Sequence, residues 1–339
     1  MFRRYTRAIT VPLLAALLAA CGQSSPDEPF DNYLVRLARA LDVVVSPSAA
    51  APEPAPPRAG ALQITLEDGS LDTLDFLALH GCALQVNIGR KNSSLGRLAR
   101  PSQTLLLELE FLRLAPDCIM QLQSEGRTAL AQQLAAAQQL KITQLPARIF
   151  NATLGSDEYR AFWRGKRRAG EFPAVPDAVT LQALHAINAA VTRWLAGAYG
   201  VDGFEFELLL SEVAGGNGGE LLNALQRQAH WLAVADGLLQ ARHARGPLCG
   251  PNLRHSAADI LPNVVEKYFV EALQPGAAAL HRNYHELLPA VRHLEELLED
   301  TLPDAFTQWR SARNAVLSRG SKAPRQHVEH IQALLAPCQ

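Results

Sequence analysis

The sequence predicts an all-α protein that folds as a non-repetitive multi-helix bundle. Apolar residues recur at three- and four-residue spacings along most of the chain after residue 70, which is the period of one helix face. The clearest series is Leu280, Tyr284, Leu287, Val291, Leu294 and Leu298, typical of a helix packed in a bundle. Glycines and prolines separate such stretches, and no segment recurs at a fixed length, which disfavours a solenoid.

Residues 1–20 are typical of an export signal. Three arginines precede an apolar run over 11–20, which is too short to span about 30 Å of hydrocarbon. The sequence Leu18-Ala19-Ala20-Cys21 is similar to the lipobox of bacterial lipoproteins, in which cleavage precedes the cysteine. We therefore expect Cys21 to become the lipidated, acylated N-terminus. The alternative is an ordinary cleavage site with an incidental cysteine.

The resemblance to a lipobox also implies where the protein is located in the cell. Several acyl chains make membrane anchoring effectively permanent. Gly22 follows the cysteine in place of the Asp that often retains lipoproteins at the inner membrane. By that analogy we expect a lipid anchor at the periplasmic face of the outer membrane. The inner membrane stays open as the alternative.

The bulk composition is that of a globular chain with a sizeable core. It is 48% hydrophobic and 19% charged over 339 residues. Removal of Arg3, Arg4 and Arg7 with the signal moves the formal net charge from −1 to −4. A chain this close to neutral lacks the broad basic excess of a nucleic-acid-binding protein, so we expect no nucleic-acid partner.

The mature chain is predicted to begin with a tether and one helix. Residues 21–29 form a short polar tether, and 30–339 a single helical domain. Tyr33, Leu34, Leu37, Leu41 and Val44 predict a helix over 30–44. The segment 47–60 contains five prolines and is predicted to be an extended, flexible connection.

The remaining chain is predicted to be helical. We expect a helix over 72–91 and new helices opening at Ser102 and Asp117. Residues 62–66 and 107–114 also alternate with period two, so a small β-hairpin is an alternative that the flanking helices disfavour. Further helices are expected at 126–152, 156–164, 177–198, 204–214, 218–244, 255–273, 277–299, 303–318 and 324–335.

Four cysteines besides Cys21 fit an oxidising compartment: Cys82, Cys118, Cys249 and Cys338. We favour the pairs Cys82–Cys118 and Cys249–Cys338, because each joins segments expected to be neighbours. Buried free thiols are the alternative. No C-x-x-C pair supports a zinc site.

The segment 89–102 is the strongest candidate for a ligand or partner site. It is polar, glycine-bounded and basic, and it follows an apolar stretch. Its side chains suit an anionic group, aided by amides at the start of the next helix. An interhelical turn in which Asn and Ser cap helix ends is the alternative. The candidate residues are Arg90, Asn92, Ser93, Ser94, Arg97, Arg100 and Ser102.

The same region carries a family resemblance. A tyrosine-bearing first helix, a proline-rich connection, the stretch LDTLDFLALHGCALQVNIGRKNSSLG and then PSQTLLLELEFLRLAPDC resemble an uncharacterised bacterial lipoprotein family. The resemblance covers most of residues 30–125. The resemblance implies the same cellular location and the same fold, and the family has no assigned reaction. In this chain Lys91 directly precedes Asn92, where the pattern favours arginine.

No motif assigns a reaction, a cofactor or a metal. The histidine pairs His281/His285 and His327/His330 lack the further ligands that a transition metal needs. We predict a non-catalytic binding or support component of the cell envelope, with the membrane, an envelope protein or peptidoglycan as partner. The alternative is an envelope hydrolase or small-ligand binder whose site assembles around residues 90–102.

Overall fold

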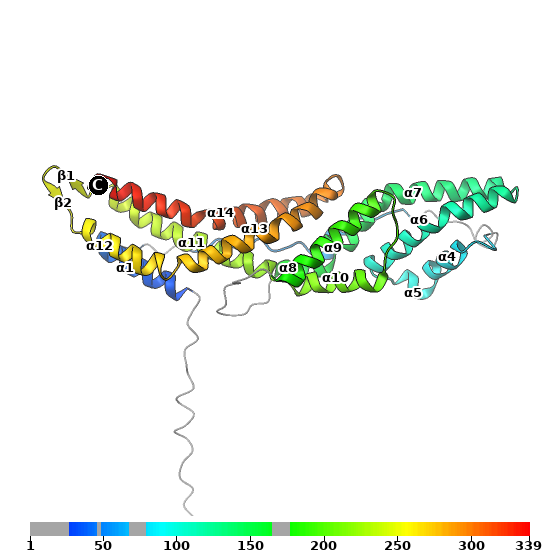
Figure 1. Cartoon of the computed structure of the whole chain (residues 1–339), viewed down its shortest axis with the longest axis horizontal. Helices are drawn as coiled ribbons and strands as arrows, with labels where there is room; N and C mark the ends of the chain where they lie inside the picture. Colours follow the sequence, from blue (N-terminus) through cyan, green and yellow to red (C-terminus); the bar gives the residue numbers. More distant parts are fainter. Residues whose placement is uncertain (1–26, 46–48, 68–78, 165–176) are drawn as a thin grey trace, which may run out of the picture.

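The computed structural model describes residues 27–45, 49–67, 79–164 and 177–339. The predicted all-α bundle is confirmed: within these ranges helices dominate, with one two-stranded ladder (Figure 1). In chain order the elements are α1 (Glu28–Leu41), α2 (Ala59–Leu62), α4 (Leu84–Asn92), α5 (Ser94–Arg97), α6 (Pro101–Ser124), α7 (Thr128–Ala152), α8 (Asp157–Arg164), α9 (Ala178–Leu195), α10 (Gly203–Gly215), α11 (Gly218–His243), β1 (Cys249–Gly250), β2 (Leu253–Arg254), α12 (Ala257–Val264), a π-helical turn (Val265–Val270), α13 (Gln274–Leu297), a 3-10 turn (Glu299–Thr301), α14 (Asp304–Leu335) and a final 3-10 turn (Ala336–Cys338).

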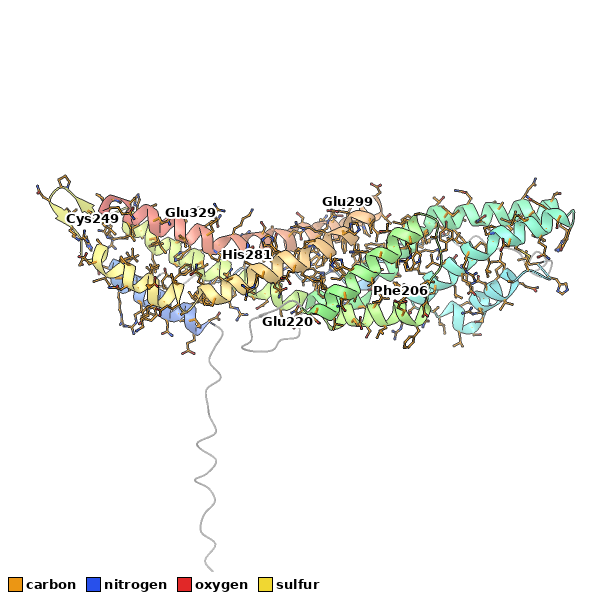
Figure 2. The ribbon with its side chains drawn as sticks, in the orientation of Figure 1. Phe206, Glu220, Cys249, His281, Glu299 and Glu329 are labelled. Atoms are coloured by element: carbon orange, nitrogen blue, oxygen red, sulfur yellow. A yellow bond between two sulfur atoms is a disulfide. The ribbon has the colours of Figure 1, made fainter. Side chains whose placement is uncertain are left out.

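The molecule is elongated and has two hydrophobic cores. Figure 1 shows α1, α12 and the strands at one end and α4, α5, α6 and α7 at the other. The larger core is built on α6 to α10 and α13, and the smaller one on α1, α12 and the π-helical turn. Helices α11 and α14 supply residues to both cores and so join the two ends; side chains fill the interior along their length (Figure 2). None of the described helices is long and apolar enough to cross a membrane.

Helix α1 contains the predicted apolar face and packs on the smaller core, but it begins at Glu28, two residues inside the predicted tether. Tyr33 and Leu37 are buried on its inner face. The helix ends at Leu41, three residues before the predicted end, because Asp42 adopts a left-handed conformation (φ 52°). At its start Trp231 of α11 donates a hydrogen bond to the carboxylate of Asp27.

Residues 49–58 of the proline-rich connection form no regular helix or strand, and hydrogen bonds hold them to the bundle. The predicted connection ran to residue 60, but its last two residues belong to α2. The indole of Trp309 donates to the carbonyl of Pro54 at 3.0 Å, and Gln226 donates to the carbonyl of Ala51. Further on, the side-chain amide of Asn151 pairs with both the N–H and the carbonyl of Ile64 at 2.9 Å. Side chains of α11 and α14 therefore satisfy two backbone carbonyls of the connection, and a side chain of α7 satisfies the backbone of Ile64 beyond α2.

The helix predicted over 72–91 differs from the structure in its described part. Residues 68–78 lie outside the described residues. Residues 79–82 form a turn in which Gly81 has φ +93°, and helix α4 begins only at Leu84. A left-handed residue cannot continue a helix, so Gly81 ends any helical stretch before α4.

Two predicted helix breaks are absent. Helix α6 continues through Pro116 and α14 through Pro324, so the separate helices expected at Asp117 and at 324–335 are parts of longer ones. In α6 the apolar face is buried on both sides of the proline, at Leu112 and Leu122, against α7. Tertiary packing therefore outweighs the loss of one hydrogen bond at each proline.

Both favoured disulfides are present. Cys82 joins Cys118 with Cα atoms 5.5 Å apart, and Cys249 joins Cys338 with Cα atoms 5.0 Å apart. The first fixes the turn before α4 to α6. The second ties the C-terminus to the short ladder in which Cys249 faces Arg254, an element that the sequence pattern did not predict.

Candidate functional site

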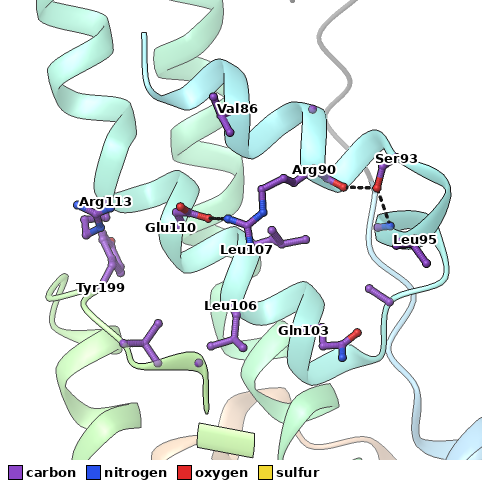
Figure 3. Close-up of a pocket in the computed structure, with 15 residues that line it drawn as sticks. Val86, Arg90, Ser93, Leu95, Gln103, Leu106, Leu107, Glu110, Arg113 and Tyr199 are labelled. Atoms are coloured by element: carbon purple, nitrogen blue, oxygen red, sulfur yellow. Dashed lines mark hydrogen bonds and ion pairs between the residues drawn. The ribbon is translucent and has the colours of Figure 1, made fainter. Parts of the chain in front are cut away.

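A groove of about 920 Å³ lies over α6 between the α4–α5 corner and the turn that precedes α10 (Figure 3). It brings together segments that are far apart in the sequence, since Tyr199, Val201 and Gly203 form one wall and residues 86–99 the other. Its lining is Val86, Gly89, Arg90, Ser93, Leu95, Gly96, Ala99, Gln103, Leu106, Leu107, Glu110, Arg113, Tyr199, Val201 and Gly203.

The structure places two of the seven predicted site residues in this lining, Arg90 and Ser93. The other five do not line the groove. Asn92, Ser94, Arg97 and Arg100 are exposed beside it, and Ser102 is buried in the first turn of α6.

Much of the polar character of the 89–102 segment serves its own turn. The hydroxyl of Ser93 accepts a hydrogen bond from the N–H of Gly96 at 3.0 Å and donates to the carbonyl of Arg90 at 2.7 Å. The guanidinium of Arg97 donates to the carbonyl of Asn92 at 3.0 Å. Ser93 is thus the N-cap of α5, so the capping interpretation accounts for this serine.

Position 96 requires glycine because backbone carbonyl groups of α4 lie very close to it. A Cβ atom at this position would lie 2.3 Å from the carbonyl oxygens of both Arg90 and Lys91. Only glycine leaves room for this turn. The Ser-Ser-Leu-Gly pattern on which the family resemblance partly rests therefore has a local structural cause.

Charges in the groove are partly paired. Arg90 donates to the carboxylate of Glu110 at 2.9 Å, and Asn87 donates to the same oxygen at 2.9 Å and to the carbonyl of Leu107 at 3.0 Å. Arg113 lines the groove and lies beside Tyr199 in Figure 3, and no described residue forms an ion pair with Arg113. The groove therefore offers an apolar wall and one cationic group available to a ligand.

The sequence pattern did not single out Glu110, Arg113 or Tyr199. Glu110 and Arg113 follow one another at the three-residue spacing of an ordinary polar helix face, which carries no sign of a groove. Tyr199 lies more than eighty residues further along the chain, in the turn between α9 and α10, and no local signal connects it with α6.

Beneath the α4 wall, a buried carboxylate is surrounded by three cations. Glu108, 1% exposed, lies 2.7 Å from the ammonium of Lys91, 2.5 Å from that of Lys141 and 3.7 Å from the guanidinium of Arg148. Burial alone would raise the pKa of Glu108, but these three charges outweigh it and lower the pKa. For Lys141, burial outweighs the attraction of Glu108 and lowers the pKa. This cluster holds α4, α6 and α7 together.

A second buried cluster places a tyrosine, a histidine and an aspartate in the order in which a proton relay would use them. The burial of its tyrosine and histidine leaves a substrate no access to them. The hydroxyl of Tyr33 lies 2.6 Å from Nε2 of His327, whose Nδ1 lies 2.5 Å from the carboxylate of Asp236. Tyr33 and His327 are 1% and 0% exposed. Burial, and then the charge of Asp236, raise the pKa of Tyr33, which disfavours a phenolate nucleophile. The cluster docks α1 on α11 and α14.

A third cluster is structural as well. Arg313 is fully buried between the rings of Trp163 and Trp309, 4.4 and 4.8 Å from their centroids, and pairs with Glu295 at 2.8 Å. Tyr159 donates to Glu295 at 3.0 Å, and burial followed by the charge of that carboxylate raises its pKa. These contacts join α8, α13 and α14 inside the larger core.

The groove can contact a ligand through its apolar side chains and through Arg113. Ser93 is its one serine, and in the described structure the Ser93 hydroxyl contacts backbone groups of its own turn and no carboxylate or imidazole. Among the described residues no three histidines, cysteines or carboxylates converge as metal ligands would. Among the described residues that line the groove, no nucleophile contacts a base and no set of metal ligands converges.

Comparison with known proteins assigns the chain to a family but gives no activity, ligand or partner. No curated protein matches the chain, and no solved structure does. One family model, described as a protein of unknown function (DUF3080), matches residues 30–339. The chain belongs to this family of unknown function, DUF3080.

Proposed function

We propose that this protein is a lipid-anchored component of the bacterial cell envelope, held at the periplasmic face of the outer membrane, with a non-catalytic binding or support role. The anchor is Cys21, and the binding surface is the groove over α6. The observation that carries the binding role is the groove itself, which combines an apolar wall with the cationic Arg113 and holds no paired nucleophile.

The proposed location rests on the N-terminal sequence and on the disulfides. The lipobox resemblance makes Cys21 the lipidated residue. The Cys82–Cys118 and Cys249–Cys338 bonds are of the kind that persists in an oxidising compartment and is rare in the cytosol. Both observations favour export, and they are independent of one another.

Fractionation of cells tests the anchor. Wild-type protein is expected in the outer-membrane fraction. The Cys21→Ser variant is expected either in the soluble periplasm or as an uncleaved precursor, because it lacks the sulfur that carries diacylglycerol. Unchanged acylation and outer-membrane fractionation of Cys21→Ser would overturn the proposed address.

Affinity capture from intact envelopes tests the groove. Arg113→Glu is expected to lose captured components without lowering the melting temperature, because no described residue pairs with Arg113. Arg282→Glu, an exposed arginine of α13, is the matched control and is expected to retain them. An identical set of captured components for all three proteins would contradict a binding role of the groove.

A small-ligand binder is the second candidate. The volume of about 920 Å³ lies within the range of small-molecule sites, and Arg113 suits an anionic ligand. Thermal-shift screening of anionic metabolites against wild-type and Arg113→Glu proteins separates this candidate from the first. Stabilisation of the wild type alone would favour it.

A further inference from the structure

The corner formed by α4 and α5 presents apolar side chains to solvent. Leu95 is 84% exposed and Leu98 is 85% exposed, and Val86 on the same wall is 67% exposed. These are among the most exposed large apolar side chains of the described residues. Single exposed leucines are ordinary, but two of them three residues apart at the tip of a turn mark a contact surface.

The same corner carries unbalanced positive charge. Residues 84–100 include four basic residues and no Asp or Glu. Lys91 is directed inward to Glu108, and Arg90 pairs with Glu110. Arg97 and Arg100 are exposed, and no described carboxylate forms an ion pair with either of them. Two arginines therefore alternate with two leucines at the tip of the corner.

The corner lies on the same long side of the molecule as helix α1. In Figure 1 both α5 and α1 are on the lower side of the view. Cys21 precedes Asp27 by six residues, so a chain of this length can place a lipid at Cys21 no farther than about 22 Å from Asp27, the residue before α1. A bilayer reached by that lipid can therefore extend along the side that carries the corner.

We propose that the α4–α5 corner is a second membrane contact that recognises an anionic lipid surface. Leu95 and Leu98 enter the interface between headgroups and acyl chains, and Arg97 and Arg100 bind lipid phosphates. This inference rests on the proposed anchor for its geometry and names the chemistry of the partner. Phe204, 82% exposed across the groove, adds apolar contact only, because Asp202 and Glu205 beside it are acidic.

Charge and shape favour a lipid surface over a protein partner. Residues that anchor protein–protein interfaces sit near the centre of well-packed pockets, where they lose water on binding. Leu95 and Leu98 protrude at the tip of a turn, with arginines beside them whose long side chains can reach phosphate while the leucines insert. This is the pattern of a basic amphipathic surface segment.

Co-sedimentation with vesicles tests the proposal. The probe protein is residues 22–339 without lipid, which keeps every described contact, so the anchor at Cys21 cannot account for binding. It is expected to sediment with vesicles of phosphatidylcholine and phosphatidylglycerol, to bind phosphatidylcholine alone much less, and to dissociate at high salt. Arg97→Gln/Arg100→Gln is expected to weaken binding about 25-fold, roughly fivefold per charge. Leu95→Ser/Leu98→Ser is expected to weaken it at least about tenfold.

Matched controls and alternative occupants complete the test. Leu253→Ser/Arg282→Gln changes an exposed leucine and an exposed arginine elsewhere and is expected to bind like wild type, with all variants melting alike. Equal binding to neutral vesicles, or unchanged binding of the corner variants, would overturn the proposal. So would displacement of the protein by soluble glycerol phosphate, or self-association that the leucine variants abolish. The anchor would survive each of these results, because fractionation of Cys21→Ser tests it separately.

Discussion

Gln228 of α11 donates a hydrogen bond of 2.8 Å to the backbone carbonyl of Gly320 in α14. In an unbroken helix that carbonyl would accept from the N–H of residue 324, which in this chain is Pro324 and has none. The approach is close at this point, since a Cβ on Gly320 would lie 2.4 Å from the carbonyl oxygen of Leu225. A side chain of one helix thus supplies the hydrogen bond that proline removes from another.

Removal of this donor is expected to destabilise the protein. Gln228→Leu leaves the buried carbonyl of Gly320 without a partner, at a cost of about 1–3 kcal/mol in the free energy of unfolding. Urea denaturation measures the loss. In a Pro324→Ala background the restored N–H serves the carbonyl, so the effect of Gln228→Leu is expected to shrink. An equal loss in both backgrounds would contradict the assignment.

Gly96 is expected to tolerate no side chain. Gly96→Ala places a Cβ against the carbonyls of Arg90 and Lys91 and is expected to destabilise by about 1–3 kcal/mol through forced backbone movement. Gly237→Ala, within α11, is the matched control. Nothing lies within 4 Å of its Cβ position, so it is expected to stabilise by about 0.5–1 kcal/mol. If the melting temperatures of Gly96→Ala and Gly237→Ala both rise or both fall relative to wild type, this explanation is refuted.

The buried Glu108 cluster is expected to make stability depend on acidity. Its folded-state pKa is lowered, so ionised Glu108 contributes stability above the ordinary glutamate pKa of about 4.3, and this contribution is lost as the pH falls through the folded-state value. Glu108→Gln is expected to lose about 3–5 kcal/mol near pH 7, where it leaves Lys91, Lys141 and Arg148 around a neutral group.

The pH profile distinguishes this cluster from a surface pair. Urea midpoints measured from acidic to neutral pH are expected to fall less steeply toward acid for Glu108→Gln than for wild type. Glu299→Gln, which removes the half-exposed partner of Arg310, is expected to change stability by about 0–1 kcal/mol. Parallel profiles for wild type and Glu108→Gln would show that Glu108 does not carry the acid dependence.

Both disulfides are expected to form completely and to stabilise by similar amounts. The Cys249–Cys338 bond, with a sequence separation of 89, contributes about 4–5 kcal/mol, and the Cys82–Cys118 bond, with a separation of 36, about 4 kcal/mol. Paired Cys→Ala substitutions measure these values. Alkylation of the denatured, unreduced protein is expected to leave all four cysteines unmodified. Mass shifts on them would disprove the pairing.

Most helices and both disulfides could be predicted from the sequence. The three- and four-residue spacing identified most helices, and the expected neighbourhood of segments identified both disulfides. The new helices expected at Asp117 and at 324–335 are absent because long-range packing, and at Pro324 the side chain of Gln228, offset the hydrogen bond that each proline removes. The spacing of residues around Pro324 does not reveal that Gln228, from another helix, lies against the carbonyl of Gly320.

The candidate site was predicted only in part for the same reason. The 89–102 segment stood out by composition, and Arg90 and Ser93 do line the groove. The opposite wall comes from Tyr199, Val201 and Gly203, whose sequence surroundings are those of an ordinary helix–helix turn. The burial of Glu108 could not be predicted either. A glutamate within Leu-Glu-Leu-Glu is usually exposed to solvent, and the burial of Glu108 depends on Lys141 and Arg148 of another helix.

Mass spectrometry of the N-terminus of the native protein tests the central claim most directly. Protein isolated from the membrane fraction of the producing bacterium is expected to begin at Cys21, with diacylglycerol on its sulfur and an acyl chain on its amine. A peptide that spans Ala20 and Cys21, or a mature N-terminus at which Cys21 carries a free thiol, would contradict lipid anchoring at this residue.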